Sequence, residues 1–353
     1  MLPSYRCRCL APQRGFVLIT AGIAAVILVG ALGLAVDLGR LYIVKSEAQS
    51  FVDSAAIDAA LQLDGTSAGV NDALTTAHNA LGRYDLGQFT FQPITVEFAT
   101  AVGGPWNAAG SASTSSSFVR VQVHPNVKLF FLPLLKVGPT STVGASAVAA
   151  QIPKTGFREA LFPFSPFAHN STPPDFGLVP GNLYTLRWPS NPTGKNACPG
   201  DATSRMIASE RGFIENTASS TIRSAILGGY QSAFRQVGDV VDMTGGAKQT
   251  QLDALDTRIL QDTDTSSQTY SIYKNKGAGN GRRIVAVPIN DGGTPPGANH
   301  RIVSIAAFFL RPSAEYGSGG GEAWCAEYIG AWVQGSTKTG VGQTGAWVVR
   351  LVQ

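Results

Sequence analysis

Charge is scarce in this 353-residue chain: charged residues make up 14% of it, against about 25% in ordinary soluble domains. The formal net charge is only +4 and no stretch of five Lys or Arg residues occurs, which argues against nucleic acid as a partner. Four cysteines are too few for a disulfide scaffold and lack the spacing of a zinc site. Glycine (40) and proline (20) are abundant instead, which favours a protein of strands and turns over a helical bundle.

Motifs that carry chemistry are missing as well. No Gly-Xaa-Ser-Xaa-Gly element, phosphate-binding loop or dinucleotide fingerprint occurs. We interpret the four scattered histidines as loop or surface residues: His78, His124, His169 and His300. We interpret four aspartates as a solvated helix end, because they lack the glycine turn and terminal glutamate of a calcium loop: Asp253, Asp256, Asp262 and Asp264. The sequence therefore predicts no enzyme, no cofactor, no metal site and no small-molecule substrate.

One long apolar run stands near the N-terminus. Residues 15–36 contain no charge, and 22 residues exceed the about 20 that a helix needs to cross a bilayer. A buried core helix and a cleaved secretory signal are the alternatives, but the apolar region of a signal is usually shorter. We therefore expect an uncleaved transmembrane helix. Arginines at positions 6, 8 and 14 precede the run, which predicts a cytoplasmic N-terminus (residues 1–14) and a chain whose bulk crosses the membrane.

The helix is expected to continue beyond the membrane. Small and apolar residues recur at steps of three and four as far as the Asp64-Gly65 stop signal: Leu41, Val44, Ala48, Val52, Ala55, Ala59 and Leu63. This alanine stripe allows two interpretations. It packs on the protein's own globular domain, or it forms a stalk that packs against like helices in an assembly.

The polar residues around this helix carry a family resemblance. They resemble the N-terminal module of TadG-like Flp (tight adherence) pilus-assembly proteins over roughly residues 13–63, and the matching positions are Arg14, Gly15, Asp37, Gly39, Arg40, Gln49, Asp53, Ala55 and Ala56. Residues 118–123 and 141–149 look similar to the next region of that family. The resemblance implies a membrane-anchored role in pilus building at the bacterial inner membrane, with other pilus-assembly proteins as partners. No catalytic residue comes with it.

Prepilin processing is a separate question. Gly15-Phe16 looks like a prepilin cleavage site, but Thr20 stands where the fifth mature residue of a pilin is a glutamate. We therefore expect the segment to remain uncleaved.

The remainder of the chain is expected to be rich in strands. Strands are predicted at 94–100 and 118–124 by their alternating pattern. The apolar segment 127–137 is interpreted as core, with membrane contact as the alternative, because Pro133 and its short length argue against a second span. Six prolines between 153 and 180 predict a linker or a long surface connection.

Residues 181–353 are expected to form a second, strand-rich body. Strands are predicted at 182–188, 282–290, 301–310, 327–334 and 346–352, helix and turn at 205–235, and a short helix at 254–260. The fold class is thus α+β: a transmembrane helix (15–36), an amphipathic helix with a strand-rich region (37–152), a proline-rich linker (153–180) and a β-rich extracytoplasmic domain (181–353).

The cysteines divide by compartment. Cys7 and Cys9 precede the span and are expected to be free thiols in the cytoplasm. Cys198 and Cys325 lie beyond it, where disulfides persist, so we predict that they pair; two buried small hydrophobic residues are the alternative.

Two functions remain in competition. The first is a non-enzymatic component of Flp/Tad-type pilus assembly or of an associated secretion apparatus in the inner membrane, with its bulk facing the periplasm or the cell exterior. The alternative is a membrane-tethered binding or adhesin protein that uses the anchor only for attachment.

Overall fold

The computed structural model describes residues 14–85, 87–135, 138–190, 197–201, 210–214, 218–243, 249–292, 299–342 and 344–353. Cys7, Cys9 and the arginines at positions 6 and 8 lie outside these residues. The chain divides into two compact units, each described here by itself. Unit 1 comprises Met1–Val52, Leu81–Ile94 and Gln122–Ser146, and unit 2 comprises Asp53–Ala80, Thr95–Val121 and Ala147–Gln353.

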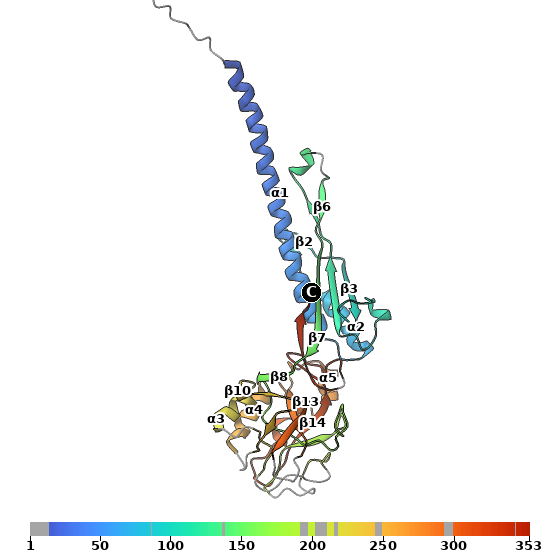
Figure 1. The fold of residues 1–353 in the computed structure, drawn as a ribbon, viewed down its shortest axis with the longest axis vertical. Coiled ribbons are helices and arrows are strands. Elements are labelled where there is room, and N and C mark those ends of the chain that lie inside the picture. Colours follow the sequence, from blue (N-terminus) through green and yellow to red (C-terminus); the bar gives the residue numbers. More distant parts are fainter. Residues whose placement is uncertain are drawn as a thin grey trace, which may run out of the picture. The chain divides into compact units, whose positions relative to one another are not determined.

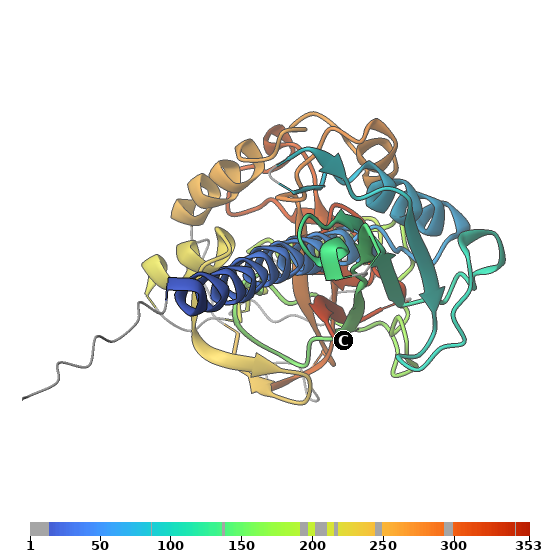
Figure 2. The ribbon, with the colours of Figure 1, turned by 90° about the horizontal axis from the view of Figure 1, so that it is seen from above.

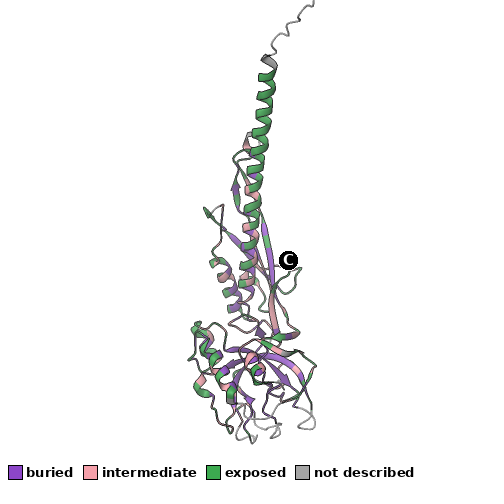
Figure 3. Cartoon of the chain, turned by 90° about the vertical axis from the view of Figure 1, so that its left-hand side faces the viewer, coloured by how far each residue is buried: buried purple, intermediate pink, exposed green. Residues whose placement is uncertain are grey.

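Helix α1 (Arg14–Ala60) is one continuous element of 47 residues, about 70 Å long. No proline interrupts it, so the apolar run and the amphipathic segment extend as one rod (Figure 1). Residues 17–32 are exposed, whereas buried positions recur from Gly33 onward (Figure 3). The prediction of a long apolar helix that continues into an amphipathic one, followed by strand-rich sheets, is confirmed.

Unit 1 adds two short antiparallel ribbons to the helix. The first pairs β1 (Arg83–Tyr84) with β2 (Phe89–Thr90). The second pairs β5 (Asn126–Lys128) with β6 (Thr140–Thr142), with the 3₁₀ turn η2 (Leu132–Leu135) between them. Aromatic stacking fixes the first ribbon, because the ring of Phe91 lies 4.9 Å from the rings of both Phe51 on α1 and Tyr84. The second ribbon lies alongside α1 (Figures 1 and 2).

Unit 2 contains one five-stranded sheet and most residues of a second. The first has the order β11-β13-β14-β9 with β12 also paired to β13, and its members are β9 (Leu183–Arg187), β11 (Val240–Val241), β12 (Ile284–Asn290), β13 (His300–Leu310) and β14 (Trp324–Gly330). The second has the order β15-β16-β7-β4-β3, and its members are β3 (Ile94–Ala99), β4 (Phe118–Val123), β7 (Ala145–Pro153), β15 (Trp332–Val333) and β16 (Ala346–Leu351). A separate ribbon pairs β8 (Gly156–Glu159) with β10 (Tyr230–Gln236).

Short helices complete unit 2: α2 (Ser67–Asn79), α3 (Ser219–Ile226), α4 (Leu252–Leu260) and α5 (Tyr270–Lys276), with the 3₁₀ turns η1 (Ala109–Ser111), η3 (Gln249–Gln251) and η4 (Ser313–Glu315). Strand β12 is buried along its whole length, and its alternate side chains enter two different cores. Val285 and Val287 share a core with residues of α3 and α4, while Ile284 and Ala286 share the other with Tyr273 of α5. The first sheet is therefore covered on both faces.

The proline-rich segment 153–180 differs from the expected linker. Phe162 and Phe164 are buried in the core of unit 2, and the Phe162 N–H donates to the Ala286 carbonyl of β12 at 2.7 Å. Nearby, the amide of Asn290 donates to the Ser165 carbonyl at 2.9 Å. Residues 161–168 are thus buried along the edge strand β12, whereas residues 170–174 and 179–180 are exposed, as expected of a surface connection. Since β16 also pairs with β7, the regions 37–152 and 181–353 contribute strands to one sheet.

Two further expectations fail locally. The region 205–235, expected as helix and turn, contains helix α3 but also strand β10, and residues 202–209 and 215–217 lie outside the described part of the chain. The apolar segment 127–137 is core only in part: Val127 and Leu129 are 1% and 4% exposed, whereas Phe130 and Phe131 are 54% and 38% exposed, and residues 136 and 137 lie outside the described part of the chain.

Candidate functional site: a polar row on helix α1

Asp37 is the first charged residue after the apolar run, and its side chain is buried. One carboxylate oxygen accepts the backbone N–H of Phe130 at 3.0 Å. The other accepts the N–H groups of Phe131 and Leu132 at 2.8 and 2.7 Å. Hydrogen bonds to an ionised acceptor are short and strong, so Asp37 fastens the turn between β5 and β6 to the helix.

Arg40 lies about one turn further along the helix and reaches both ribbons. One guanidinium nitrogen lies 2.8 and 2.7 Å from the two carboxylate oxygens of Asp85, in the turn between β1 and β2. Another nitrogen donates to the Lys128 carbonyl at 3.2 Å, and the guanidinium carbon lies 4.4 Å from the Phe130 ring centroid. An arginine suits this position because its planar guanidinium has several N–H donors that can bond both ribbons at once. A lysine has a single ammonium nitrogen and could not reach both.

Asp85 is held from a second direction. Its backbone lies in the left-handed region (φ 55°), which aspartate tolerates better than most residues. The carboxylate of Glu47 accepts the Asp85 N–H at 3.2 Å. Arg40 and Glu47 together therefore stabilise the side chain and the backbone of this turn.

The row of contacts continues to the start of β7. The amide of Gln49 donates to the Ser146 carbonyl at 3.1 Å, and the Lys45 ammonium donates to the Gly144 carbonyl. We call the helix side chains that make these bonds the polar row: Asp37, Arg40, Lys45, Glu47 and Gln49. Each bonds a chain segment more than 35 positions away in the sequence, so the polar row assembles unit 1 around the helix.

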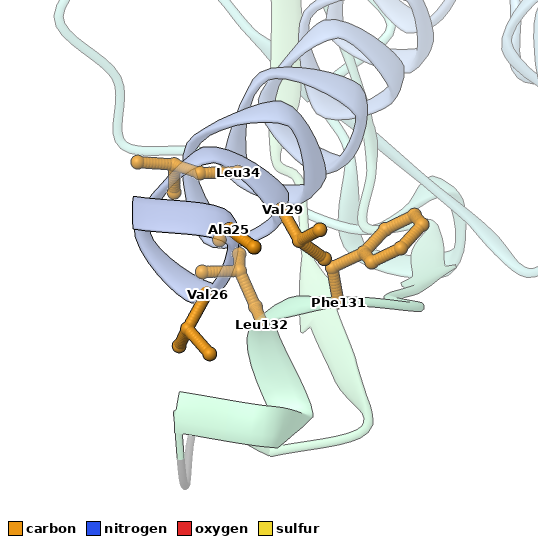
Figure 4. Close-up of a pocket in the computed structure, with 7 residues that line it drawn as sticks. Ala25, Val26, Val29, Leu34, Phe131 and Leu132 are labelled. Atoms are coloured by element: carbon orange, nitrogen blue, oxygen red, sulfur yellow. The ribbon is translucent and has the colours of Figure 1, made fainter. Parts of the chain in front are cut away.

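On the N-terminal side of the polar row, the turn between β5 and β6 contacts the apolar run of α1. A Cβ atom added to Gly33 would lie 2.5 Å from the Cβ of Phe131, so only glycine permits this approach. Phe131 and Leu132 then line an apolar groove of about 390 Å³ with helix side chains that include Ala25, Val26 and Val29 (Figure 4).

The residues that carry the family resemblance have different structural roles. Asp37, Arg40 and Gln49 belong to the polar row. Arg14 and Gly15 form the first residues of α1, and an added Cβ at Gly39 would meet no atom within 4 Å, so no packing requirement within the described residues explains that glycine. Asp53 is half-buried and has interactions within the structure. Ala55 and Ala56 are fully buried.

The alanine stripe is buried along its length by the protein's own chain. Ala48, Val52, Ala55 and Ala59 are all 0% exposed. This burial supports the interpretation in which the stripe packs within the protein, and it contradicts a stripe that is free to face a partner helix.

Other polar clusters in unit 2 serve the fold. Asp262 accepts from the Tyr273 hydroxyl at 2.9 Å and the Arg283 N–H at 3.0 Å. Asp264 accepts from the side chains of Ser267 and Lys276, and together these bonds hold its pKa well below its usual range although burial acts in the opposite direction. Within the described residues no group of three or more His, Cys, Asp or Glu side chains is arranged to hold a metal ion.

Two histidines pair with carboxylates, which the sequence did not indicate. His300 is buried, contrary to the surface position expected for it, and its imidazole lies 2.9 Å from Glu210. His169 lies 3.0 Å from Asp201. Among the hydrogen bonds of the described residues, none joins either imidazole to a serine or cysteine side chain, so no nucleophile is paired with a base there.

Cys198 and Cys325 are joined by a disulfide in unit 2, with their Cα atoms 5.7 Å apart. The bridge links the loop after β9 to strand β14. Strands β9 and β14 already pair in the sheet. It closes a sequence separation of 127 residues.

Comparison with known proteins places one part of the chain. Residues 15–62 match the family of putative Flp pilus-assembly TadE/G-like proteins, and this segment contains the apolar run, the polar row and the buried alanines. The match does not extend to the strands at 118–123 and 145–153. No curated protein and no solved structure matches the chain.

Proposed function

We propose that this protein is a non-enzymatic, membrane-anchored component of Flp/Tad-type pilus assembly or of an associated secretion apparatus. The observation that carries the proposal is the coincidence of the family match with the structure of unit 1. Of the polar positions that resemble the family, Asp37 and Arg40 hold the ribbons on the helix, and Gln49 bonds the start of β7. The family match therefore falls on side chains that have a structural task in this chain, which favours the family's role for it.

The apolar run is the membrane anchor in this proposal. Its large side chains are exposed, and examples are Val17 (66%), Leu18 (77%) and Val26 (74%). An apolar surface of this extent is untenable in water but is stable in the hydrocarbon core of a bilayer. The three arginines before the run favour a cytoplasmic N-terminus, and the bulk of the chain then faces the periplasm or the exterior. The disulfide is consistent with that oxidising side.

Topology is tested by accessibility. We expect Cys198 and Cys325 to resist alkylation in intact membranes until a reductant is added, and N-terminal sequencing of membrane-extracted protein to find no mature chain beginning at Phe16. Free alkylation of both thiols in native material would contradict the extracytoplasmic placement. A chain that begins at Phe16 would contradict the uncleaved anchor.

The role in assembly is tested by partners. We expect pilus-assembly proteins to co-purify with the tagged full-length protein after mild cross-linking in its native membrane. The alternative function, a tethered binding or adhesin protein, is favoured by the exposed aromatic side chains of β10, where Tyr230 is 72% and Phe234 45% exposed. Under that alternative, the Tyr230→Ser/Phe234→Ser variant loses surface binding, and no pilus-assembly protein co-purifies with the unaltered chain.

A further inference from the structure

We propose that the tip of the β5–β6 ribbon, residues 129–135, inserts into the lipid leaflet on the C-terminal side of the span. The tip and the apolar helix would then form one composite membrane anchor. This inference rests on the proposed membrane span. It is carried by the position of the tip along α1, by its exposed apolar side chains and by the state of its backbone donors.

The position of the tip follows from its contacts with the helix. Phe131 lies against Gly33, three residues before the end of the apolar run at Val36 and thus about 4.5 Å inside it. Leu132 lines the groove with Val29, which lies roughly 10 Å inside that end (Figure 4). One leaflet contributes about 15 Å of hydrocarbon. If residues 15–36 span the bilayer, the tip lies within the leaflet.

The tip has the surface of a membrane element rather than of a core segment. Phe130 and Phe131 are 54% and 38% exposed, and they continue the apolar surface of the helix. The helix residues just beyond the run, Arg40 and Tyr42, have the chemistry of the membrane–water interface, and Tyr42 is 77% exposed. The apolar groove between tip and helix is open to the same surroundings as the span, so its occupant in this proposal is a lipid acyl chain.

Irregular backbone in a membrane is costly unless its polar groups are bonded. In the tip these donors are accounted for one after another. The Leu129 N–H donates to the Pro139 carbonyl, and the next three N–H groups, of residues 130–132, donate to Asp37. Pro133 has no N–H to satisfy. Asp37, the first charged residue after the run, is in turn buried under these donors. The arrangement therefore keeps the N–H groups of residues 129–132 and the Asp37 carboxylate from direct contact with lipid.

Spin labels test the depth of the tip. The background is the full-length chain with Cys7→Ser and Cys9→Ser and with its disulfide intact, reconstituted in vesicles of phosphatidylethanolamine and phosphatidylglycerol. Single cysteines for labelling are introduced as Leu132→Cys at the tip, Leu28→Cys on the exposed helix and Thr142→Cys at the exposed base of β6. Phe130→Cys is a second tip position in case Leu132→Cys does not fold. Collision rates with oxygen and with a water-soluble nickel chelate are measured for each label.

We expect the ratio of oxygen to chelate collisions at the tip label to be high and similar to the ratio at the Leu28 position. It should be clearly higher than the ratio at the Thr142 position. A tip label as accessible to the chelate as Thr142 would overturn the proposal. Low collision rates with both reagents would overturn it too, because they would mean that protein, such as a second copy, covers the tip. A chelate-accessible label at Leu28 would instead refute the membrane span itself, so the two failures are distinguishable.

Discussion

Arg40 and Asp85 form an ion pair across 45 positions of sequence, with one guanidinium nitrogen 2.8 and 2.7 Å from the two carboxylate oxygens. Their side chains are only 22% and 13% exposed. The pair links helix α1 to the turn between β1 and β2, a turn that no local pattern in the sequence relates to the helix. The coupling free energy of Arg40 and Asp85 therefore reports how strongly this turn is held on the helix.

A double-mutant cycle on this pair gives the first prediction. We expect Arg40→Ala and Asp85→Ala to be coupled by about 0.5–3 kcal/mol in the free energy of unfolding, measured by denaturant titration in detergent micelles. The more exposed pair Arg311–Glu315, at 2.7 Å and spaced i,i+4, is the matched control. Its coupling should be only about 0.2–1 kcal/mol, the range of exposed ion pairs. Equal coupling in both pairs would mean that Arg40–Asp85 does not hold the unit together.

The approach of Phe131 to Gly33 gives the second prediction. Gly33→Ala places a methyl group 2.5 Å from the Phe131 Cβ, so the ribbon tip must move away. Hydrogen exchange of the amides of residues 130–132 should then accelerate, because their bonds to Asp37 lengthen or break. Gly30→Ala is the control, since its added methyl group meets no atom within 4 Å and its gain in helix propensity is the same. Unchanged exchange in Gly33→Ala would show that the tip is not held there.

The burial of the alanine stripe gives the third prediction. Replacing Ala55 and Ala59 together with glutamine should lower the thermal midpoint, since each overpacked core position costs about 1–3 kcal/mol. Asp58→Gln on the exposed face of the same helix should leave the midpoint nearly unchanged. A double variant that keeps its midpoint and loses only its partners would restore the stalk interpretation.

Two buried carboxylates give the fourth prediction, on pH. Burial raises the pKa of Asp64, but the hydrogen bonds from Lys274, at 2.6 Å, and from Thr66 outweigh it and lower the pKa below its usual value. The pKa of Asp264 is lowered for similar reasons. A carboxylate whose pKa is lower when folded stabilises the protein above its unfolded pKa of about 3.9, and this contribution is lost as the pH falls toward the folded pKa.

The unfolding free energy should therefore fall with pH below about 5, and less steeply in the Asp64→Asn and Asp264→Asn variants. Asp58→Asn, at an exposed position, serves as the control and should retain the slope of the unaltered protein. The unfolding free energies of the four proteins are measured by urea titration between pH 3 and 7. Identical slopes in all four would show that folding lowers the pKa of neither Asp64 nor Asp264.

The sequence by itself determined the elements with strong local signals. The charge-free run of residues 15–36 predicts a helix long enough to cross a bilayer, and the three- and four-residue periodicity extends that predicted helix to Leu63, close to its observed end at Ala60. Alternation and β-branched residues located β3, β4, β12, β13 and β16 to within a residue or two. Two cysteines predicted beyond the span were enough to suggest their pairing. The residues of the family resemblance could be named in advance for the same reason: they lie on one continuous helix.

Tertiary structure alone decided what each of those residues touches. Nothing local ties Asp37 to the amides of Phe130 and Leu132, because such pairing depends on how distant segments pack, and the same holds for Arg40 and Asp85. Proline content suggested a linker or surface connection at 153–180, but burial of its aromatic side chains outweighed that signal at residues 161–168 and brought them into the core. Conversely, the apolar residues Phe130 and Phe131 remained exposed, since the turn that carries them is held against a helix that is itself apolar on every face.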